Sequence, residues 1–157
     1  MTSKERLHNM LGSFGLDPEF EFELSKVRGF DPATISEVTD GIHVTAADGV
    51  DAALAAGHYV INVADELESN ADAKIIVQPY SRDIRSNLDA VAQLMDEVLS
   101  QGNRTVAVHC AMGMERSVLA VVWYLTTNKG MTVDNAYDLV KAGRPIALDR
   151  REWAGIE

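Results

Sequence analysis

The feature that most constrains the fold of this chain is one continuous segment, residues 105–127. Residues 105–108 form a β-branched, apolar run that is typical of a buried strand. The run leads into Cys110, and five residues later Arg116 opens a nearly all-apolar stretch, 118–125, with the composition of a buried helix. A strand that passes through a short loop into a packed helix is characteristic of α/β domains. The segment therefore predicts an α/β fold in which a central, mostly parallel, twisted sheet is flanked by helices.

The remaining sequence fits this architecture. A turn at Thr39-Asp40-Gly41 separates two short runs and predicts a β-hairpin. The further elements we expect are strands at 59–63 and 74–77 and helices at 4–14, 48–56, from 86 or 87 to 100, and 132–143. The 157 residues suffice for one domain. We expect residues 1–34 to form a helix and a variable lead-in packed on the main domain, 35–157.

Charge and hydropathy exclude several classes of partner. The chain has 24 acidic and 14 basic residues, which gives a net charge of −10. Such a surface disfavours nucleic acid and anionic membranes as general partners. No apolar run approaches the ~20 residues of a membrane span, and the N-terminus lacks the layout of a secretory signal. We expect a cytoplasmic protein.

The chain has a single cysteine, Cys110. An intramolecular disulfide and a paired-cysteine metal site are therefore excluded, and we expect neither metal nor cofactor. A lone cysteine is either a buried apolar residue or a reactive thiol, and the residues around it decide between the two.

The loop after Cys110 has the length and composition of a cradle for one tetrahedral anion. Its backbone amides, and the positive end of the following helix, can converge on one point. Gly113 provides a position where unusual backbone angles cost little. Arg116 offers a planar fork that binds two oxygens of a phosphate at once. The predicted phosphate-binding residues are Ala111, Met112, Gly113, Met114, Glu115 and Arg116.

The same surroundings favour the thiolate form of Cys110. Thiols near helix N-termini and cations have pKa values of roughly 3.5–7.5, and a thiolate in a phosphate cradle is a nucleophile toward phosphorus. Ser117 is placed to donate a hydrogen bond to the sulfur when it departs as a leaving group. We assign His109 to orienting the loop backbone through its ring nitrogens. An accessible thiolate of this kind is also expected to be oxidised by peroxide to sulfenic acid.

The string HCAMGMERS resembles the HCxxGxxR[S/T] signature of the cysteine-dependent protein tyrosine phosphatases. More specifically, the chain is similar to a small, atypical dual-specificity phosphatase over most of residues 35–153. Residues 35–44 resemble the first hairpin of that family, YVINVADE (59–66) resembles one of its strands, and AYDLVKAGRP (136–145) resembles the helix after the phosphate-loop helix.

This resemblance implies that residues 35–157 are a phosphatase catalytic domain. The domain would hydrolyse phosphoproteins through a phosphocysteine and would also bind phosphate, sulfate or vanadate. The resemblance further implies a general acid, an Asp on a loop roughly 25–35 residues before the cysteine. Asp83, 27 residues upstream of Cys110, fits best. Asp72, before the preceding strand, and Asp89, within a helix, rank lower.

Two departures from the family pattern bear on the substrate. Glu115 stands beside Arg116, where it weakens the positive field if it faces inward; we expect it to face solvent or to accept hydrogen bonds. The loop has no Lys, which favours phosphoprotein over phosphoinositide. No segment resembles the long phosphotyrosine-recognition loop of the tyrosine-specific enzymes, so we expect phosphoserine and phosphothreonine to be accepted as well as phosphotyrosine.

Other interpretations stay open at this point. The same cradle could serve a non-catalytic phospho-ligand binding module, or a phosphatase of RNA 5′-phosphates, lipids or carbohydrates. A sulfurtransferase fits the spacing less well. His8, His43 and His58 are expected to be structural. Arg144, Arg150 and Arg151 either bind a second phosphate near the pocket or are solvated surface charges, and Phe20, Phe22 and Phe30 are expected to pack against the domain.

Overall fold

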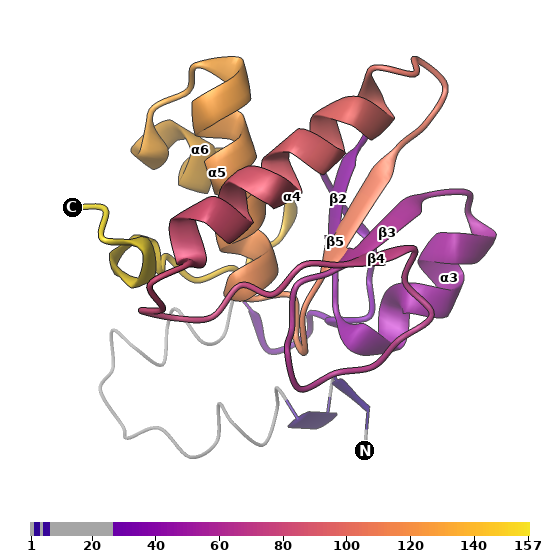
Figure 1. Ribbon diagram of the computed structural model, residues 1–157. Coiled ribbons are helices and arrows are strands. Elements are labelled where there is room, and N and C mark those ends of the chain that lie inside the picture. Colours follow the sequence, from indigo (N-terminus) through magenta and orange to yellow (C-terminus); the bar gives the residue numbers. More distant parts are fainter. Residues whose placement is uncertain (1, 4, 7–26) are drawn as a thin grey trace, which may run out of the picture.

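The computed structural model describes residues 2, 3, 5, 6 and 27–157. Within these residues, the domain contains five strands and four α-helices, arranged as in Figure 1. In chain order the elements are β1 (Ser36–Thr39), β2 (Ile42–Thr45), η1 (Ala47–Gly49), α3 (Val50–Ala55), β3 (Tyr59–Asn62), β4 (Ala73–Lys74), α4 (Ile84–Leu99), β5 (Val106–His109), α5 (Arg116–Lys129), α6 (Val133–Gly143) and η2 (Arg151–Ala154). This mixed α/β architecture confirms the predicted fold class.

The sheet has the strand order β1-β2-β5-β3-β4. The pairing of β1 with β2 is antiparallel and the other pairings are parallel. The central strand, β5, is hydrogen-bonded on both sides, with Val108 opposite Val44 of β2 and Ile61 of β3. Because β2, β5 and β3 are parallel, their carboxyl ends meet at one edge of the sheet.

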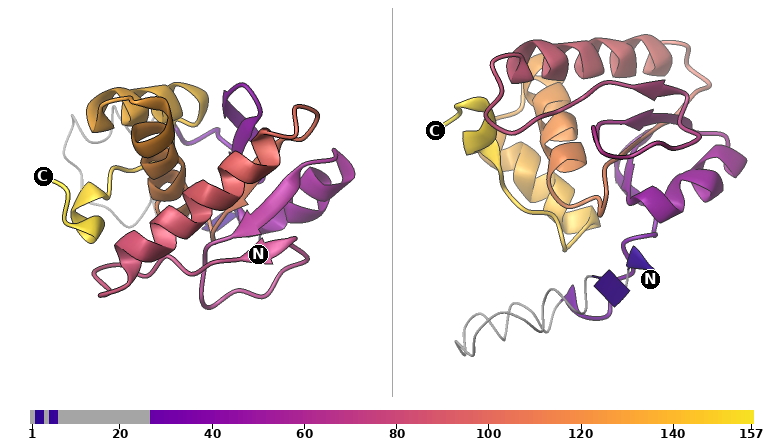
Figure 2. Two further views of the ribbon diagram at one scale, coloured as in Figure 1. Left: turned by 45° about the horizontal axis from the view of Figure 1, so that its top comes forward. Right: turned by 60° about the horizontal axis from the view of Figure 1, so that its bottom comes forward.

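The two faces of the sheet are covered unequally. Val60 and Ala107 point to the face that packs on Val50 and Ala53 of α3. The residues next to them along the strands, such as Val108, point to the other face and belong to the larger core formed with α4, α5 and α6. Figure 2 shows α4 beside α5 on one side of the sheet and α3 on the other. Successive side chains of β5 point to opposite faces, and all four residues of the strand are buried because both faces of the sheet are covered there.

Several predicted elements are confirmed closely. The predicted hairpin forms, since β1 and β2 pair antiparallel on either side of the turn, and Gly41 in that turn has a φ of 80°. Helix α5 is buried along most of its length, from Ser117 to Leu125. Thr132 caps α6, since its side chain accepts a hydrogen bond from the amide of Asn135 at 3.1 Å.

Two predicted boundaries were wrong. The strand expected at 74–77 is only Ala73–Lys74, although the amide of Val77 still bonds to the carbonyl of Val63. Helix α4 begins at Ile84, earlier than expected, because the Ser86 hydroxyl donates back to the Asp83 carbonyl within the first turn and does not cap the helix.

The predicted N-terminal helix at 4–14 lies almost entirely outside the described residues, as do His8, Phe20 and Phe22. The third phenylalanine of that set, Phe30, packs with Met114 and Ile146 in a small apolar cluster beside the phosphate loop.

Candidate active site

Cys110 lies at the carboxyl edge of the sheet, directly after the central strand β5. The neighbouring strands hold the backbone on both sides of it. The amide of Ala47, after β2, donates to the carbonyl of Ala111, and the amide of Val63, after β3, donates to the carbonyl of His109. The thiol is therefore presented at the sheet edge where ligands of parallel α/β sheets bind.

The environment of Cys110 stabilises its thiolate. The residue is 3% exposed, and its Sγ lies 3.2 Å from the Ser117 hydroxyl. Burial raises the pKa of Cys110, but hydrogen bonds from the Ser117 side chain and amide, the charge of Arg116 and the amide of Gly113 outweigh it and hold the pKa below its usual value. The amides that contribute are those of Gly113 in the loop and of Ser117 at the start of α5.

Gly113 permits the sharp bend in the middle of the loop. Its φ is 66°, in the left-handed region that glycine tolerates best. A Cβ at this position would lie 2.5 Å from Nη2 of Arg144 and 2.7 Å from the carbonyl oxygen of Thr45. The site therefore demands glycine both for its backbone angle and for the space around it.

Arg144 supports the loop from behind, and sequence reasoning missed this role. We expected either a second phosphate-binding residue or a solvated surface charge; instead the side chain is completely buried. Its guanidinium donates to the carbonyls of Gly113 (2.6 Å) and Met112 (3.1 Å) in the loop. The remaining acceptors are the carbonyls of Pro32, Thr34 and Val44 and the hydroxyl of Ser36. Burial lowers the pKa of Arg144 to about 10, so the side chain is charged at neutral pH.

His109 makes the contacts that a loop-orienting residue requires. Its Nδ1 lies 3.0 Å from the Cys110 carbonyl oxygen, and its Nε2 lies 2.9 Å from the Ser69 hydroxyl. Burial lowers the pKa of His109, against a smaller opposing effect of the Cys110 carbonyl. A neutral ring that donates from Nδ1 to the carbonyl and accepts at Nε2 from Ser69 satisfies both contacts.

Arg116 is held by a carboxylate that the sequence did not reveal as a partner. Nη1 and Nη2 of Arg116 each donate to one oxygen of Glu66 at 2.6 Å. The hydrogen bond from Arg116 lowers the pKa of Glu66 to about 2, and the pKa of Arg116 is raised in turn. The ion pair with Glu66 uses two of the five N–H groups of the Arg116 guanidinium, so three remain to bind an anion.

Glu115 forms an ion pair with Arg150. One of its oxygens accepts from Nε of Arg150 at 2.8 Å. The guanidinium of Arg150 in turn lies over the ring of Trp153, 5.5 Å from its centroid. The carboxylate beside Arg116 is therefore neutralised by a neighbouring cation.

Asp83 lies on the loop before α4, at the N-cap position, with its side chain exposed. Among the described residues its carboxylate accepts no capping hydrogen bond. Asp72 and Asp89, the lower-ranked candidates for the general acid, both accept hydrogen bonds. Asp72 accepts from the Val60 amide at 2.8 Å, and Asp89 accepts from the indole of Trp123 at 2.8 Å. Of the three carboxylates, Asp83 is the one without a hydrogen-bond partner in the described part of the chain.

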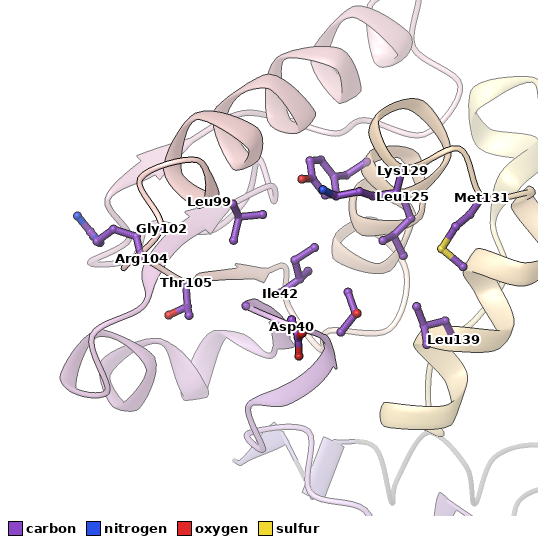
Figure 3. Close-up of a pocket in the computed structure, with 13 residues that line it drawn as sticks. Asp40, Ile42, Leu99, Gly102, Arg104, Thr105, Leu125, Lys129, Met131 and Leu139 are labelled. Atoms are coloured by element: carbon purple, nitrogen blue, oxygen red, sulfur yellow. The ribbon is translucent and has the colours of Figure 1, made fainter.

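A pocket of about 630 Å³ lies at the end of β5 opposite to Cys110, where Gly41 and Thr105 line it. Figure 3 shows its aliphatic lining, with Leu125, Met131 and Leu139 on one side and Arg104 at the rim. Because Thr105 precedes β5 and Cys110 follows it, this pocket is separate from the thiol. His43 and His58, whose ring centroids are 4.2 Å apart, bond to the Val106 carbonyl and the Thr105 hydroxyl respectively, at this same end.

Within the described part of the chain, no group of three His, Cys, Asp or Glu side chains is arranged to hold a metal ion. The helices there are also too short or too polar to cross a membrane.

Comparison with known proteins gives one consistent result. The family described as dual specificity phosphatase, catalytic domain, matches residues 41–154. Dual specificity protein phosphatase 1 of Arabidopsis thaliana is 38% identical over 72 residues, which are 46% of this chain and 36% of that protein. Dual specificity protein phosphatase 9 of Homo sapiens is 37% identical over 91 residues, 53% of this chain and 23% of that protein. The match thus spans well under half of these relatives.

Solved structures share the fold at low identity. The human DUSP28 structure has a TM-score of 0.65 at 19% identity and covers 76% of this chain and 87% of its own. A mouse putative dual specificity phosphatase complexed with zinc tungstate has a TM-score of 0.65 at 21% identity and covers 80% and 84%.

Proposed function

Since this chain belongs to the family of dual specificity phosphatase catalytic domains, we propose that it is a phosphomonoester hydrolase that acts on phosphorylated proteins through a phosphocysteine. The observation that carries the proposal is the contact of 3.2 Å between Cys110 Sγ and the Ser117 hydroxyl, in a loop that also brings the charge of Arg116 to the thiol. A thiolate beside a guanidinium is suited to attack the phosphorus of a bound phosphate.

The first step transfers the phosphoryl group to sulfur. The Cys110 thiolate attacks phosphorus in line with the ester oxygen, the S–P bond forms and the P–O bond breaks. Asp83 gives its proton to the departing oxygen, so that an alcohol or phenol leaves without charge. Arg116 and the loop amides stabilise the charge that is spread over the three equatorial oxygens.

The second step regenerates the enzyme. Water attacks phosphorus, Asp83 takes one of its protons, and the S–P bond breaks to release inorganic phosphate and the thiolate. Ser117 eases this step because its hydroxyl can donate to the sulfur as negative charge returns there. Glu66, by fixing two N–H groups of Arg116, keeps the remaining three turned toward the phosphate.

Phosphotyrosine, phosphoserine and phosphothreonine side chains are the proposed substrates. The net charge of −10 disfavours nucleic acid and anionic lipid, and the loop between Cys110 and Arg116 has no Lys to bind a polyphosphorylated headgroup. We place the protein in the cytoplasm, where thiols remain reduced.

The test is phosphate release from p-nitrophenyl phosphate and from phosphotyrosine and phosphoserine peptides. Cys110→Ser should abolish release, and vanadate should inhibit the wild type. Asp83→Asn should slow the phosphoserine peptide by ~10²–10⁴-fold, and the aryl phosphate less, because the poorer leaving group depends more on a proton donor. Asp89→Asn, six residues further along the chain in α4, is the matched control and should retain activity.

Two outcomes would favour other functions. Phosphopeptide binding without turnover, equal in the wild type and Cys110→Ser, would indicate a binding module. Release from RNA 5′-phosphates, inositol phosphates or carbohydrate phosphates but not from phosphopeptides would move the substrate outside proteins.

A further inference from the structure

A small groove runs between the loop that carries Asp83 and the C-terminal turn η2. Its volume is about 330 Å³. The loop side is formed by Tyr80, Ser81 and Arg82, together with Ile84 and Arg85 at the start of α4; residues 152–155 form the other side. In Figure 1 these two segments, far apart in the sequence, lie side by side at the beginning of α4.

Tyr80 is the most unusual residue of the groove. It is 72% exposed, and its φ of 59° is the only positive value at a non-glycine residue among the described residues. A bulky aromatic residue in this region of φ/ψ space carries strain, and strain of this kind clusters at functional sites. The backbone is held there because the Tyr80 amide donates to the carbonyl of Trp153 at 3.2 Å. The fold thus holds the Tyr80 ring in solvent although its backbone conformation is strained.

The groove is connected to the phosphate loop through a short chain of contacts. The guanidinium of Arg150 lies over the ring of Trp153 and donates a hydrogen bond to Glu115. Glu115 directly precedes the predicted phosphate-binding residue Arg116. On the other side, the loop continues from the groove directly into Asp83. Through these two links the groove adjoins the residues that are proposed to act on the phosphate, Arg116 on one side and Asp83 on the other.

The charged side chains of the groove favour binding of an acidic residue of the substrate. Arg85 is committed to the carbonyls of Ala154 (2.7 Å) and Gly155 (3.2 Å). Arg82 is exposed, and within the described ranges none of its contacts is an ion pair or hydrogen bond. Glu152 also lines the groove, so the site fits a single carboxylate at Arg82 better than a polyacidic run.

We propose that this groove is a specificity subsite that binds the peptide next to the phosphorylated residue, with an apolar or aromatic side chain against Tyr80 and a carboxylate against Arg82. The inference rests on the proposed phosphatase activity and adds a preference to it. The enzyme selects phosphoproteins with an acidic residue flanking the phosphorylated one.

The experiment uses two phosphotyrosine peptides that differ only in flanking Glu or Gln residues, with p-nitrophenyl phosphate as a substrate that has no flank. The wild type should prefer the Glu peptide by about fivefold in kcat/KM, as expected for one exposed ion pair. The preference should shrink as salt is added. Arg82→Gln should bring the ratio of the two peptides to about one. Because both peptides are compared on the same variant, a general loss of activity cancels.

Arg104→Gln is the matched control, since it removes an exposed arginine at the opposite end of β5 (Figure 3). It should preserve the wild-type ratio. Tyr80→Asn tests the aromatic contact, because Asn tolerates positive φ. It should lower kcat/KM for both peptides relative to p-nitrophenyl phosphate by about threefold to tenfold.

The outcomes separate the two proposals. Hydrolysis of p-nitrophenyl phosphate with equal kcat/KM for both peptides, or an equal effect of Arg82→Gln and Arg104→Gln, overturns the subsite and leaves the phosphatase assignment standing. A folded wild type that releases phosphate from none of these substrates overturns both.

Discussion

The ionisation of Cys110 depends on a few identified atoms. Burial alone would favour the neutral thiol, whereas the Ser117 hydroxyl and amide, the Gly113 amide and the Arg116 charge favour the thiolate. The largest of the favourable effects comes from the Ser117 side chain. Arg116 itself is kept in place by Glu66, whose pKa of about 2 means that the pair stays ionised through mildly acidic conditions. The loss of activity on the acid side of a pH–activity profile should therefore reflect protonation of groups other than Glu66.

Ser117→Ala should raise the pKa of Cys110, because it removes the hydroxyl that donates to the thiolate. The measurement is the rate of iodoacetamide alkylation as a function of pH. In the wild type the rate should reach its plateau at a pH below that of an ordinary thiol, and in the variant the midpoint should move up. Ser100→Ala, which removes a hydroxyl bonded to Asp96 at the end of α4, should leave the midpoint unchanged. Identical midpoints in all three proteins would refute the role of Ser117.

The phosphate loop as an element depends on its one glycine, which a pair of substitutions can test. Gly113→Ala and Gly102→Ala both place a Cβ at positive φ, at 66° and 78°, but only the first meets neighbouring atoms. Gly102→Ala should lower the free energy of unfolding by about 1 kcal/mol through backbone strain alone. Gly113→Ala should lower it by about 2–5 kcal/mol, because overlap with Thr45 and Arg144 is added to that strain.

Urea unfolding measures both changes, and phosphate release should be lost in Gly113→Ala alone. Equal destabilisation by the two substitutions would show that the space behind the loop can relax.

How much the sequence could predict differs from element to element. Helix α6 was predictable because its start is encoded locally, by the Thr132 cap and the apolar periodicity that follows. Helix α5 was predictable from the apolar run after Arg116. Strand β4 was too long in the prediction because it lies at the sheet edge, where pairing to β3 ends after two residues. The start of α4 was misplaced because Ser86, a good cap in isolation, bonds to the carbonyl of Asp83 instead.

In the candidate site, the residues of the HCAMGMERS string could be named from sequence, and their supports could not. Glu66 and Arg116 are 50 residues apart, and Arg144 and Gly113 are 31 apart. Contacts over such separations are set by how the strands and helices pack, and no local pattern records them. Arg144 in particular was expected to bind a second phosphate or to be a solvated charge, and both expectations missed its buried position.

At the scale of the whole molecule, Arg144 joins segments that are distant in the chain. Its hydrogen bonds reach the lead-in at Pro32, strands β1 and β2, and the phosphate loop. Arg144→Met should therefore lower the free energy of unfolding by about 3–5 kcal/mol, because several buried acceptors lose their donor at once. Arg144→Lys should recover only part of the loss, since an ammonium cannot reproduce the planar fork.

The control for this prediction is Arg104→Met, which should change the unfolding free energy by no more than about 0.5 kcal/mol because Arg104 is exposed. Chemical denaturation followed by tryptophan fluorescence compares the three variants. If Arg144→Met unfolded at the same urea concentration as Arg104→Met, the buried guanidinium would not be a structural hub.

The central position of β5 has a further consequence for how the protein acquires activity. The nucleophile follows a strand that is completed only when segments from about 45 and 65 residues earlier have docked on either side of it. Such non-local pairings form late and slowly during folding. A nascent or partly unfolded chain therefore has no working cradle, and recovery of turnover after dilution from denaturant should lag behind the return of helical signal.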